Sequence, residues 1–137
     1  SIYNATKFAL EGVGESLAKQ VAGLGIKVTN VEPGPFRTEW AGSSMVRTRR
    51  RIPDYEGTVG EHRRSLDARS GQQPGDPKRA AEAMVALSRL HEPPLHLPMG
   101  EMAFPVAREH HNDFLRELDE FEELGGPTDF PQQGNTD

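Results

Sequence analysis

Apolar residues near the beginning of the chain recur at spacings of three and four positions. This spacing places them on one side of a helix, and it predicts a helix over Ile2–Val21 with one buried stripe. The stripe consists of Ala5, Phe8, Ala9, Val13, Leu17, Ala18 and Val21. Gly12 and Gly14 lie inside the helix, where a glycine costs about 1 kcal/mol relative to alanine, and they indicate close packing against a neighbouring helix. Gly23 and Gly25 are expected to end it.

A short run of β-branched residues follows this helix. Ile26, Val28 and Val31 are interleaved with polar residues, and Pro33-Gly34-Pro35 stops the run. The pattern predicts a short strand. A helix, a tight turn and a strand in this order make half of an α/β repeat.

The middle of the chain changes character. Residues 39–75 are rich in glycine, serine and arginine, which predicts a long loop with one or two short helices. Asp76 before Pro77 is a strong helix start, because the carboxylate caps free N–H groups and a proline at the first helical position loses no hydrogen bond. A last strand is expected at residues 95–99, at the edge of a sheet because it contains a proline.

A final helix is predicted over residues 106–124, ending at Gly125-Gly126-Pro127. Its residues Leu118, Phe121 and Leu124 are expected to face inward, with an acidic run on the wet side. We therefore expect one domain at residues 1–124 and a flexible tail at residues 125–137.

Composition narrows the class of protein. Of the 137 residues, 34% are apolar and 27% are charged. This apolar content is low for a domain of this size that folds by itself. The net charge of −5 offers no general attraction for nucleic acid or for an anionic membrane, so a small-molecule or protein partner is favoured. The chain has no cysteine, which suits a reducing cytoplasm, and no run of about 18 apolar residues that could cross a bilayer. We expect a cytoplasmic protein that binds neither nucleic acid nor membrane.

The segment that most clearly indicates a catalytic function is Tyr3-Asn4-Ala5-Thr6-Lys7. Residues four apart share a helix face, with Cβ atoms about 5–6 Å apart, so the phenol of Tyr3 and the ammonium of Lys7 can interact. An ammonium close to a phenol favours the phenolate, and it can also donate hydrogen bonds to the ribose of a nucleotide. Taken alone the pattern is common in helices, where it is an ordinary exposed pair.

The surroundings favour the chemical interpretation. The helix is followed by a strand that ends in Val31-Glu32-Pro33-Gly34-Pro35-Phe36-Arg37-Thr38, and this arrangement resembles the single-domain branch of the short-chain dehydrogenase/reductase family. The similarity continues at Trp40 to Ser44, Gln73 to Pro77, Pro93 to Leu95 and Thr128 to Phe130. The resemblance implies an α/β fold, the C-terminal part of a doubly wound Rossmann-like parallel sheet with flanking helices, in which residues 1–124 belong to an NAD(P)-binding domain.

The resemblance also implies roles for individual residues. Tyr3 corresponds to the general acid/base, and Lys7 to the residue that assists it and binds the nicotinamide ribose. Both therefore count as cofactor-binding as well as catalytic. Further cofactor-binding residues are implied at the end of the strand: Pro33, Gly34, Pro35, Phe36 and Thr38.

The implied activity is the interconversion of an alcohol and a carbonyl by hydride transfer with NAD or NADP, in a homodimer or homotetramer. Ser1 lies only two residues before Tyr3, so it is not the family's catalytic serine, and the chain contains no glycine-rich phosphate loop. Together with the start at Ser1 without an initiator methionine, this predicts a truncated chain whose activity belongs to the full-length form. Two alternatives stay open: an extended-branch sugar-nucleotide epimerase or dehydratase, and a non-catalytic truncated product or interaction module.

Two other sets of residues, the arginines of the long loop and the histidines, are not assigned a catalytic or metal-binding role. The arginines at positions 47, 49, 50 and 51 are interpreted as part of a solvated loop. The family resemblance implies that this region lies over the substrate pocket, with Trp40, Met45 and Tyr55 as candidate lid residues. The histidines lack metal-ligand spacing, since His110 and His111 are adjacent and point about 100° apart on a helix. No metal site is expected.

Overall fold

The computed structural model describes residues 2–42, 44–46 and 48–130. The chain divides into two compact units, Ser1–Phe104 and Pro105–Asp137, and each is described by itself. The expectations that concern Ser1, Arg47 and the tail at residues 131–137 lie outside the described residues.

The first unit opens with α1, which spans Ile2–Val21 as predicted and runs into a 3-10 turn, η1, at Ala22–Leu24. Gly25 ends it with a φ of 72°, a left-handed value that favours glycine, and its N–H donates to the carbonyl of Ala22 at 3.1 Å. Gly14 is buried, and a Cβ there would overlap the side chain of Asn30. The close packing predicted for Gly14 therefore exists, but its neighbour is a strand.

The corresponding prediction for Gly12 is wrong. A Cβ added at Gly12 would meet nothing within 4 Å. The two glycines are two residues apart, so they point to different sides of the helix, and only the side of Gly14 faces the sheet.

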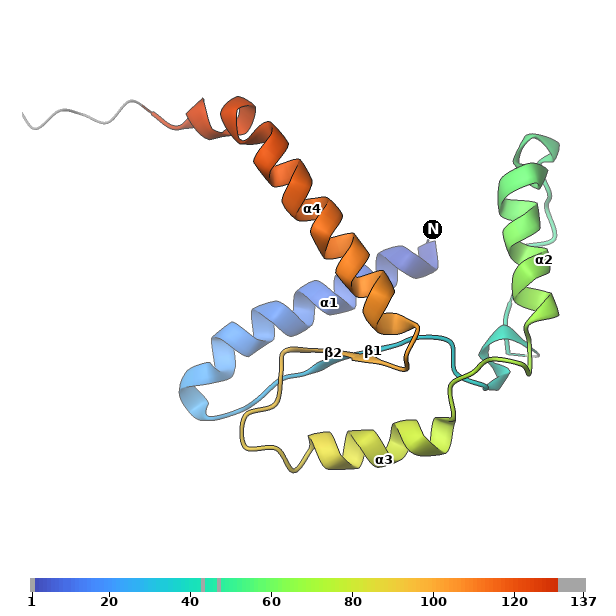
Figure 1. Cartoon of the computed structure of the whole chain (residues 1–137), viewed down its shortest axis with the longest axis horizontal. Helices are drawn as coiled ribbons and strands as arrows, with labels where there is room; N and C mark the ends of the chain where they lie inside the picture. The colour runs from blue at the N-terminus through green and yellow to red at the C-terminus, as the bar shows by residue number, and fades with distance from the viewer. Residues whose placement is uncertain (1, 43, 47, 131–137) are drawn as a thin grey trace, which may run out of the picture. The chain divides into compact units, whose positions relative to one another are not determined.

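The sheet consists of two parallel strands, β1 at Asn30–Pro33 and β2 at His96–Met99. Asn30 pairs with His96 and Pro33 with Met99. The last strand is found where it was predicted, whereas Ile26 and Val28 lie outside β1, because the ladder begins only where β2 provides a partner. Figure 1 shows α1 and α3 (Pro77–Leu87) on opposite sides of the two strands.

The long loop between β1 and α3 contains short helical pieces, as expected. These are the 3-10 turns η2 and η3, the π-helical turn η4 and the helix α2, at Glu39–Ala41, Pro53–Tyr55, Glu56–Gly60 and Glu61–Ala68 respectively. The predicted cap of the next helix is present, since the Asp76 carboxylate accepts the Lys78 N–H at 2.8 Å. The whole segment from η2 to α3 forms the crossover that two parallel strands require.

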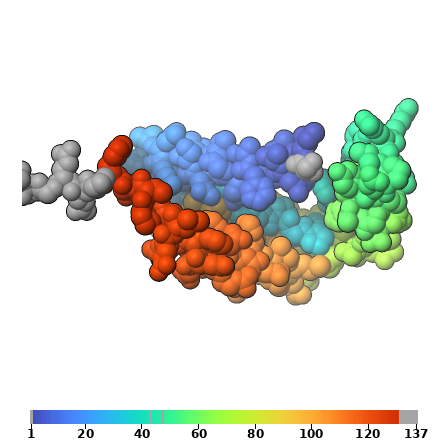
Figure 2. Space-filling view, turned by 90° about the horizontal axis from the view of Figure 1, so that it is seen from above, coloured from blue at the N-terminus to red at the C-terminus, as the bar shows by residue number. Residues whose placement is uncertain are grey.

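The first unit buries very little apolar surface. Among the described residues, the buried apolar side chains are those of Ala41 and Met99. On α1, Phe8 is 68% exposed and Val13 is 59% exposed, so the prediction that this stripe is buried is wrong. Figure 2 shows most of α1 lying at the surface. The stripe exists as a pattern on the helix, but two short strands offer too small a face to cover it.

The second unit holds most of α4, which spans Ala103–Gly125, and a 3-10 turn, η5, at Gly126–Thr128. Leu118, Phe121 and Leu124 are all exposed, so the expectation that they face inward is also wrong. Among the described residues of this unit, α4 has no second long element against which to bury them. None of the described helices combines the length and the hydrophobicity that crossing a bilayer requires.

Candidate active site

The first turn of α1 places Tyr3 and Lys7 on one face. The ammonium nitrogen of Lys7 lies 5.5 Å from the centroid of the Tyr3 ring, within the range in which a cation is attracted to a ring face. The Thr6 hydroxyl turns back along the helix and donates to the Tyr3 carbonyl at 2.7 Å. The helical spacing of the motif thus brings its phenol and its ammonium together.

Tyr3 also contacts an aromatic residue from another part of the chain. Its ring centroid lies 5.5 Å from that of Trp40, with the ring planes inclined at 54°, the tilted arrangement that aromatic pairs favour. Trp40 belongs to η2, and the Thr38 hydroxyl caps that turn by accepting the Trp40 N–H at 3.4 Å. The contact therefore joins the start of α1 to the segment just beyond β1. The family resemblance implied that Trp40 is a lid residue, and nothing in the sequence indicated its contact with Tyr3.

The bend after β1 is held by backbone hydrogen bonds. The Gly34 N–H donates to the carbonyl of Met99 at 2.9 Å, and a Cβ on Gly34 would lie 3.3 Å from that oxygen and 3.4 Å from the Cβ of Ala103. The glycine is thus needed for a close approach to β2 and to the residue that follows its loop.

The segment beyond Gly34 pairs with the residue before the cap of α3. Phe36 forms a parallel bridge with Gly75, whose N–H donates to the Pro35 carbonyl at 3.1 Å and whose carbonyl accepts the Arg37 N–H at 2.9 Å. A Cβ at Gly75 would lie 2.6 Å from the Phe36 ring. The bend from Pro33 to Phe36 is therefore fixed on both sides.

The predicted site residues are not all in mutual contact. In the part of the chain that the structure describes, no hydrogen bond, ion pair or ring contact joins Pro33, Gly34, Pro35 or Phe36 to Tyr3 or Lys7. Thr38 is connected to Tyr3 through Trp40. Tyr55 lines a separate hollow of about 290 Å³ together with Arg50 and Arg51, among other residues.

The donors of the site are open to solvent. Tyr3 is 49% exposed, and Lys7 is exposed with no hydrogen-bond or ion-pair partner among the described residues. An ammonium has three N–H donors, and here all of them are available to an incoming ligand. This donor set fits the ribose hydroxyls at the nicotinamide end of a dinucleotide, whereas the chain has no glycine-rich loop for the pyrophosphate end.

Comparison with known proteins gives consistent matches. Residues 1–47 match the family model described as short chain dehydrogenase. Oxidoreductase BOA17 of Botryotinia fuckeliana is 40% identical over 111 residues, which cover 78% of this chain and 39% of that protein. An uncharacterized oxidoreductase of Schizosaccharomyces pombe is 33% identical over 120 residues, which cover 87% of this chain and 40% of that protein.

A solved structure matches most of the chain. It is a short-chain dehydrogenase from Streptomyces avermitilis, which aligns with a TM-score of 0.80 and 39% identity over 93% of this chain and 46% of that one. The match confirms the predicted α/β class, with part of a Rossmann-like parallel sheet and its flanking helices. The chain spans less than half the length of each of these three relatives.

Proposed function

Because the chain belongs to the short-chain dehydrogenase/reductase family, we propose that the protein interconverts an alcohol and a carbonyl by hydride transfer with NAD or NADP. The observation that carries the proposal is the pairing of Tyr3 and Lys7 on the first turn of α1, with the ammonium 5.5 Å from the ring centroid. Both curated relatives named above are oxidoreductases, which supports this reaction over that of an epimerase.

In this proposal Tyr3 moves the proton. When the substrate is an alcohol, the phenolate oxygen of Tyr3 accepts the hydroxyl proton, and in the reverse direction the phenol returns it. Lys7 holds the ribose of the cofactor by hydrogen bonds beside Tyr3. A nicotinamide, when bound, accepts or supplies the hydride. The Trp40 ring lies against Tyr3 and restricts the directions that the phenol can take.

The bend after β1 is the proposed wall for the nicotinamide. The backbone of this bend, Pro33 to Phe36, is held by two hydrogen bonds. The Gly34 N–H donates to the Met99 carbonyl, and the Pro35 carbonyl accepts the Gly75 N–H. Thr38 is proposed to offer its hydroxyl to the cofactor, in addition to capping η2. A cytoplasmic location and a homodimeric or homotetrameric state are kept as proposals, the first supported by the lack of cysteine.

The test is the substitution Tyr3→Phe, made in the full-length form to which the activity is assigned. It removes the hydroxyl and keeps the ring. We expect the oxidation of secondary alcohols, followed by the absorbance of the reduced nicotinamide, to fall by about 100-fold or more, since general acid/base catalysis contributes about 10²–10⁴-fold. Nucleotide affinity, followed by the fluorescence of the single tryptophan, Trp40, should change far less.

Tyr55→Phe is the matched control, because Tyr55 is the other tyrosine of the chain and makes no ring contact with Tyr3 or Trp40. Its turnover should fall far less than that of Tyr3→Phe, because Tyr55 is at most a lid residue and lines a hollow apart from Tyr3. If Tyr3→Phe turns over at the same rate as Tyr55→Phe, Tyr3 is not the acid/base and the proposal fails.

A further inference from the structure

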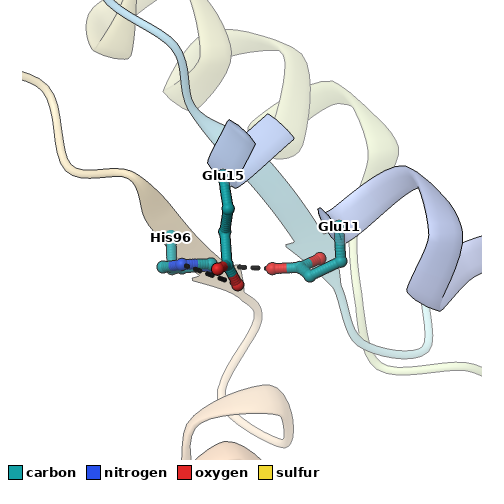
Figure 3. Close-up of side chains that lie close together, drawn as sticks. All are labelled: Glu11, Glu15 and His96. Atoms are coloured by element: carbon teal, nitrogen blue, oxygen red, sulfur yellow. Dashed lines mark ion pairs between the residues drawn. The ribbon is translucent and has the colours of Figure 1, made fainter. Parts of the chain in front are cut away.

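Four titratable side chains converge on the sheet, apart from the Tyr3 site. They are Glu11 and Glu15 on α1, Glu32 on β1 and His96 on β2, and we call them the His96 cluster. Figure 3 shows the carboxylates of Glu11 and Glu15 directed toward the His96 ring. The set combines one imidazole with three carboxylates, and its four side chains come from three elements, so it is more than an acidic stretch of one helix.

The fold brings the cluster together by one helical spacing, one strand pairing and one long-range hydrogen bond. Glu11 and Glu15 are four residues apart and share a helix face. Glu32 pairs with Pro98, so His96, two residues before Pro98, lies on the same side of the sheet as Glu32. The helix is fixed over the strand where the Asn30 amide donates to the Glu11 carbonyl at 3.2 Å.

The two nitrogens of the His96 ring have different surroundings. Nδ1 lies 2.9 Å from a Glu32 oxygen and 2.7 Å from a Glu11 oxygen. Nε2 faces a Glu15 oxygen at 3.9 Å, which is too long for a hydrogen bond. One ligand atom from each of Glu11, Glu15 and His96 can be chosen so that all three lie within 4.8 Å of one another. The side chains of these residues are 32%, 47% and 41% exposed, so an ion can reach them from solvent.

The charges in the cluster do not balance. Three carboxylates surround one imidazole, so a net negative charge remains even when the ring is protonated. No Lys or Arg of the described chain lies within salt-bridge distance of these three carboxylates. A divalent cation would supply the missing positive charge at the point where the carboxylates converge.

We propose that Glu11, Glu15 and His96 bind a divalent cation of the zinc type. The gap between Nε2 and Glu15 admits an ion at about 2.0–2.1 Å from each donor, and Glu11 must turn one oxygen from Nδ1 toward that ion to complete the set. One imidazole with carboxylates suits zinc better than the all-oxygen sites of calcium or magnesium. Glu32 then accepts the Nδ1–H of His96, which is the usual partner arrangement of a metal-binding histidine. Water completes the coordination.

The spacing of the histidines along the sequence could not predict this proposed site. His96 lies on the last strand, and its proposed fellow ligands lie on the first helix. Ligand spacing within a short segment says nothing about residues that only the pairing of β1 with β2 brings together. The same ion would tie α1 to the sheet, in a unit with little buried surface.

The test is titration of the untagged, chelator-treated protein with zinc chloride in a calorimeter. We expect one ion per chain with an affinity well below millimolar. Glu15→Gln, which keeps the shape and removes the charge, and His96→Ala should each weaken binding by at least about 10-fold, since even the partners of metal ligands contribute about 10–100-fold. Zinc should also raise the Tm of the unmodified protein and not that of Glu15→Gln.

The matched control is His91→Ala. His91 lies before β2 and outside the cluster, where its nearest carboxylate is that of Glu92 at 3.4 Å. It should bind zinc like the unmodified protein. Circular dichroism checks that His96→Ala is folded, and Glu15→Gln decides the matter if it is not. Binding that is unchanged in Glu15→Gln, or weaker than millimolar in the unmodified protein, overturns the proposal. Neither result affects the Tyr3 proposal, because no activity is measured.

Discussion

Individual residues near the start of α1 combine local and distant contacts. Lys7 reaches Tyr3 through the geometry of one helical turn, whereas Trp40 reaches it through the crossover after β1. The Tyr3 ring therefore contacts both a cation and an indole, and about half of the residue stays open to solvent. Such an arrangement leaves room for a substrate and a nucleotide while limiting the rotamers of the reactive group.

His96 should make the stability of the metal-free protein depend on pH. Partial burial disfavours the charged ring, but hydrogen bonds to Glu32 and Glu11 and the charges of both carboxylates outweigh it, so the pKa of His96 lies above its ordinary value of 6.5. Glu15 faces the other ring nitrogen and adds negative charge. A raised pKa in the folded state means that this contribution is complete below the unfolded pKa and disappears as the pH rises through the folded one.

We therefore expect, in the presence of a chelator, that the Tm falls as the pH rises above about 6.5. His96→Gln should flatten this part of the profile, while His91→Gln should leave it intact. The proton resonances of the His96 ring give the pKa directly. A midpoint below the ordinary value for histidine would contradict the expected direction.

At the scale of elements, α1 presents two sides with opposite requirements. Gly14 lies against Asn30, and Gly12 faces open space. The same substitution at two positions of one helix therefore separates helix propensity from packing. The predicted cap of α3 is a contact within one element, because the Asp76 carboxylate accepts a backbone N–H of its own helix.

Gly12→Ala should stabilise the protein by about 0.5–1 kcal/mol, because alanine is the better helix former and its methyl group meets nothing. Gly14→Ala gains the same helix propensity, but its methyl group must displace the Asn30 side chain. The Asn30 amide also donates a hydrogen bond to the Glu11 carbonyl. We expect a net loss of about 1–3 kcal/mol, as for other overpacked sites. Urea unfolding followed by circular dichroism measures both changes. Equal and favourable effects at the two positions would show that α1 does not pack on β1 through Gly14.

At the scale of the whole chain, the apolar surface exceeds what its own elements cover. A parallel sheet is ordinarily covered on both faces, and here it has two strands with few buried apolar neighbours. Phe8 and Val13 on α1, and Phe114 and Phe121 on α4, remain more than half exposed. Exposed apolar side chains on this scale favour association.

The isolated 137-residue chain should therefore self-associate and bind an apolar dye. Light scattering after gel filtration should give a mass above that of one chain, 15.1 kDa, and anilinonaphthalene sulfonate should fluoresce in its presence. Phe8→Ser combined with Val13→Ser should reduce both signals, whereas Ser substitutions at exposed polar sites such as Gln20 should not. A monomer that leaves the dye dark would show that these side chains are covered after all.

Local signals in the sequence were sufficient for the elements. The three-and-four spacing of α1, the glycine at position 25, the Asp76-Pro77 start and the proline-bearing last strand all act within a few residues, so they determined where helices and strands form and that Tyr3 and Lys7 share a face. The tertiary structure decided which faces are covered and which distant residues meet. The open side of Gly12, the contact of Tyr3 with Trp40 and the approach of His96 to Glu15 all depend on how the chain brings β1, β2 and α1 together, and no short-range pattern encodes that closure.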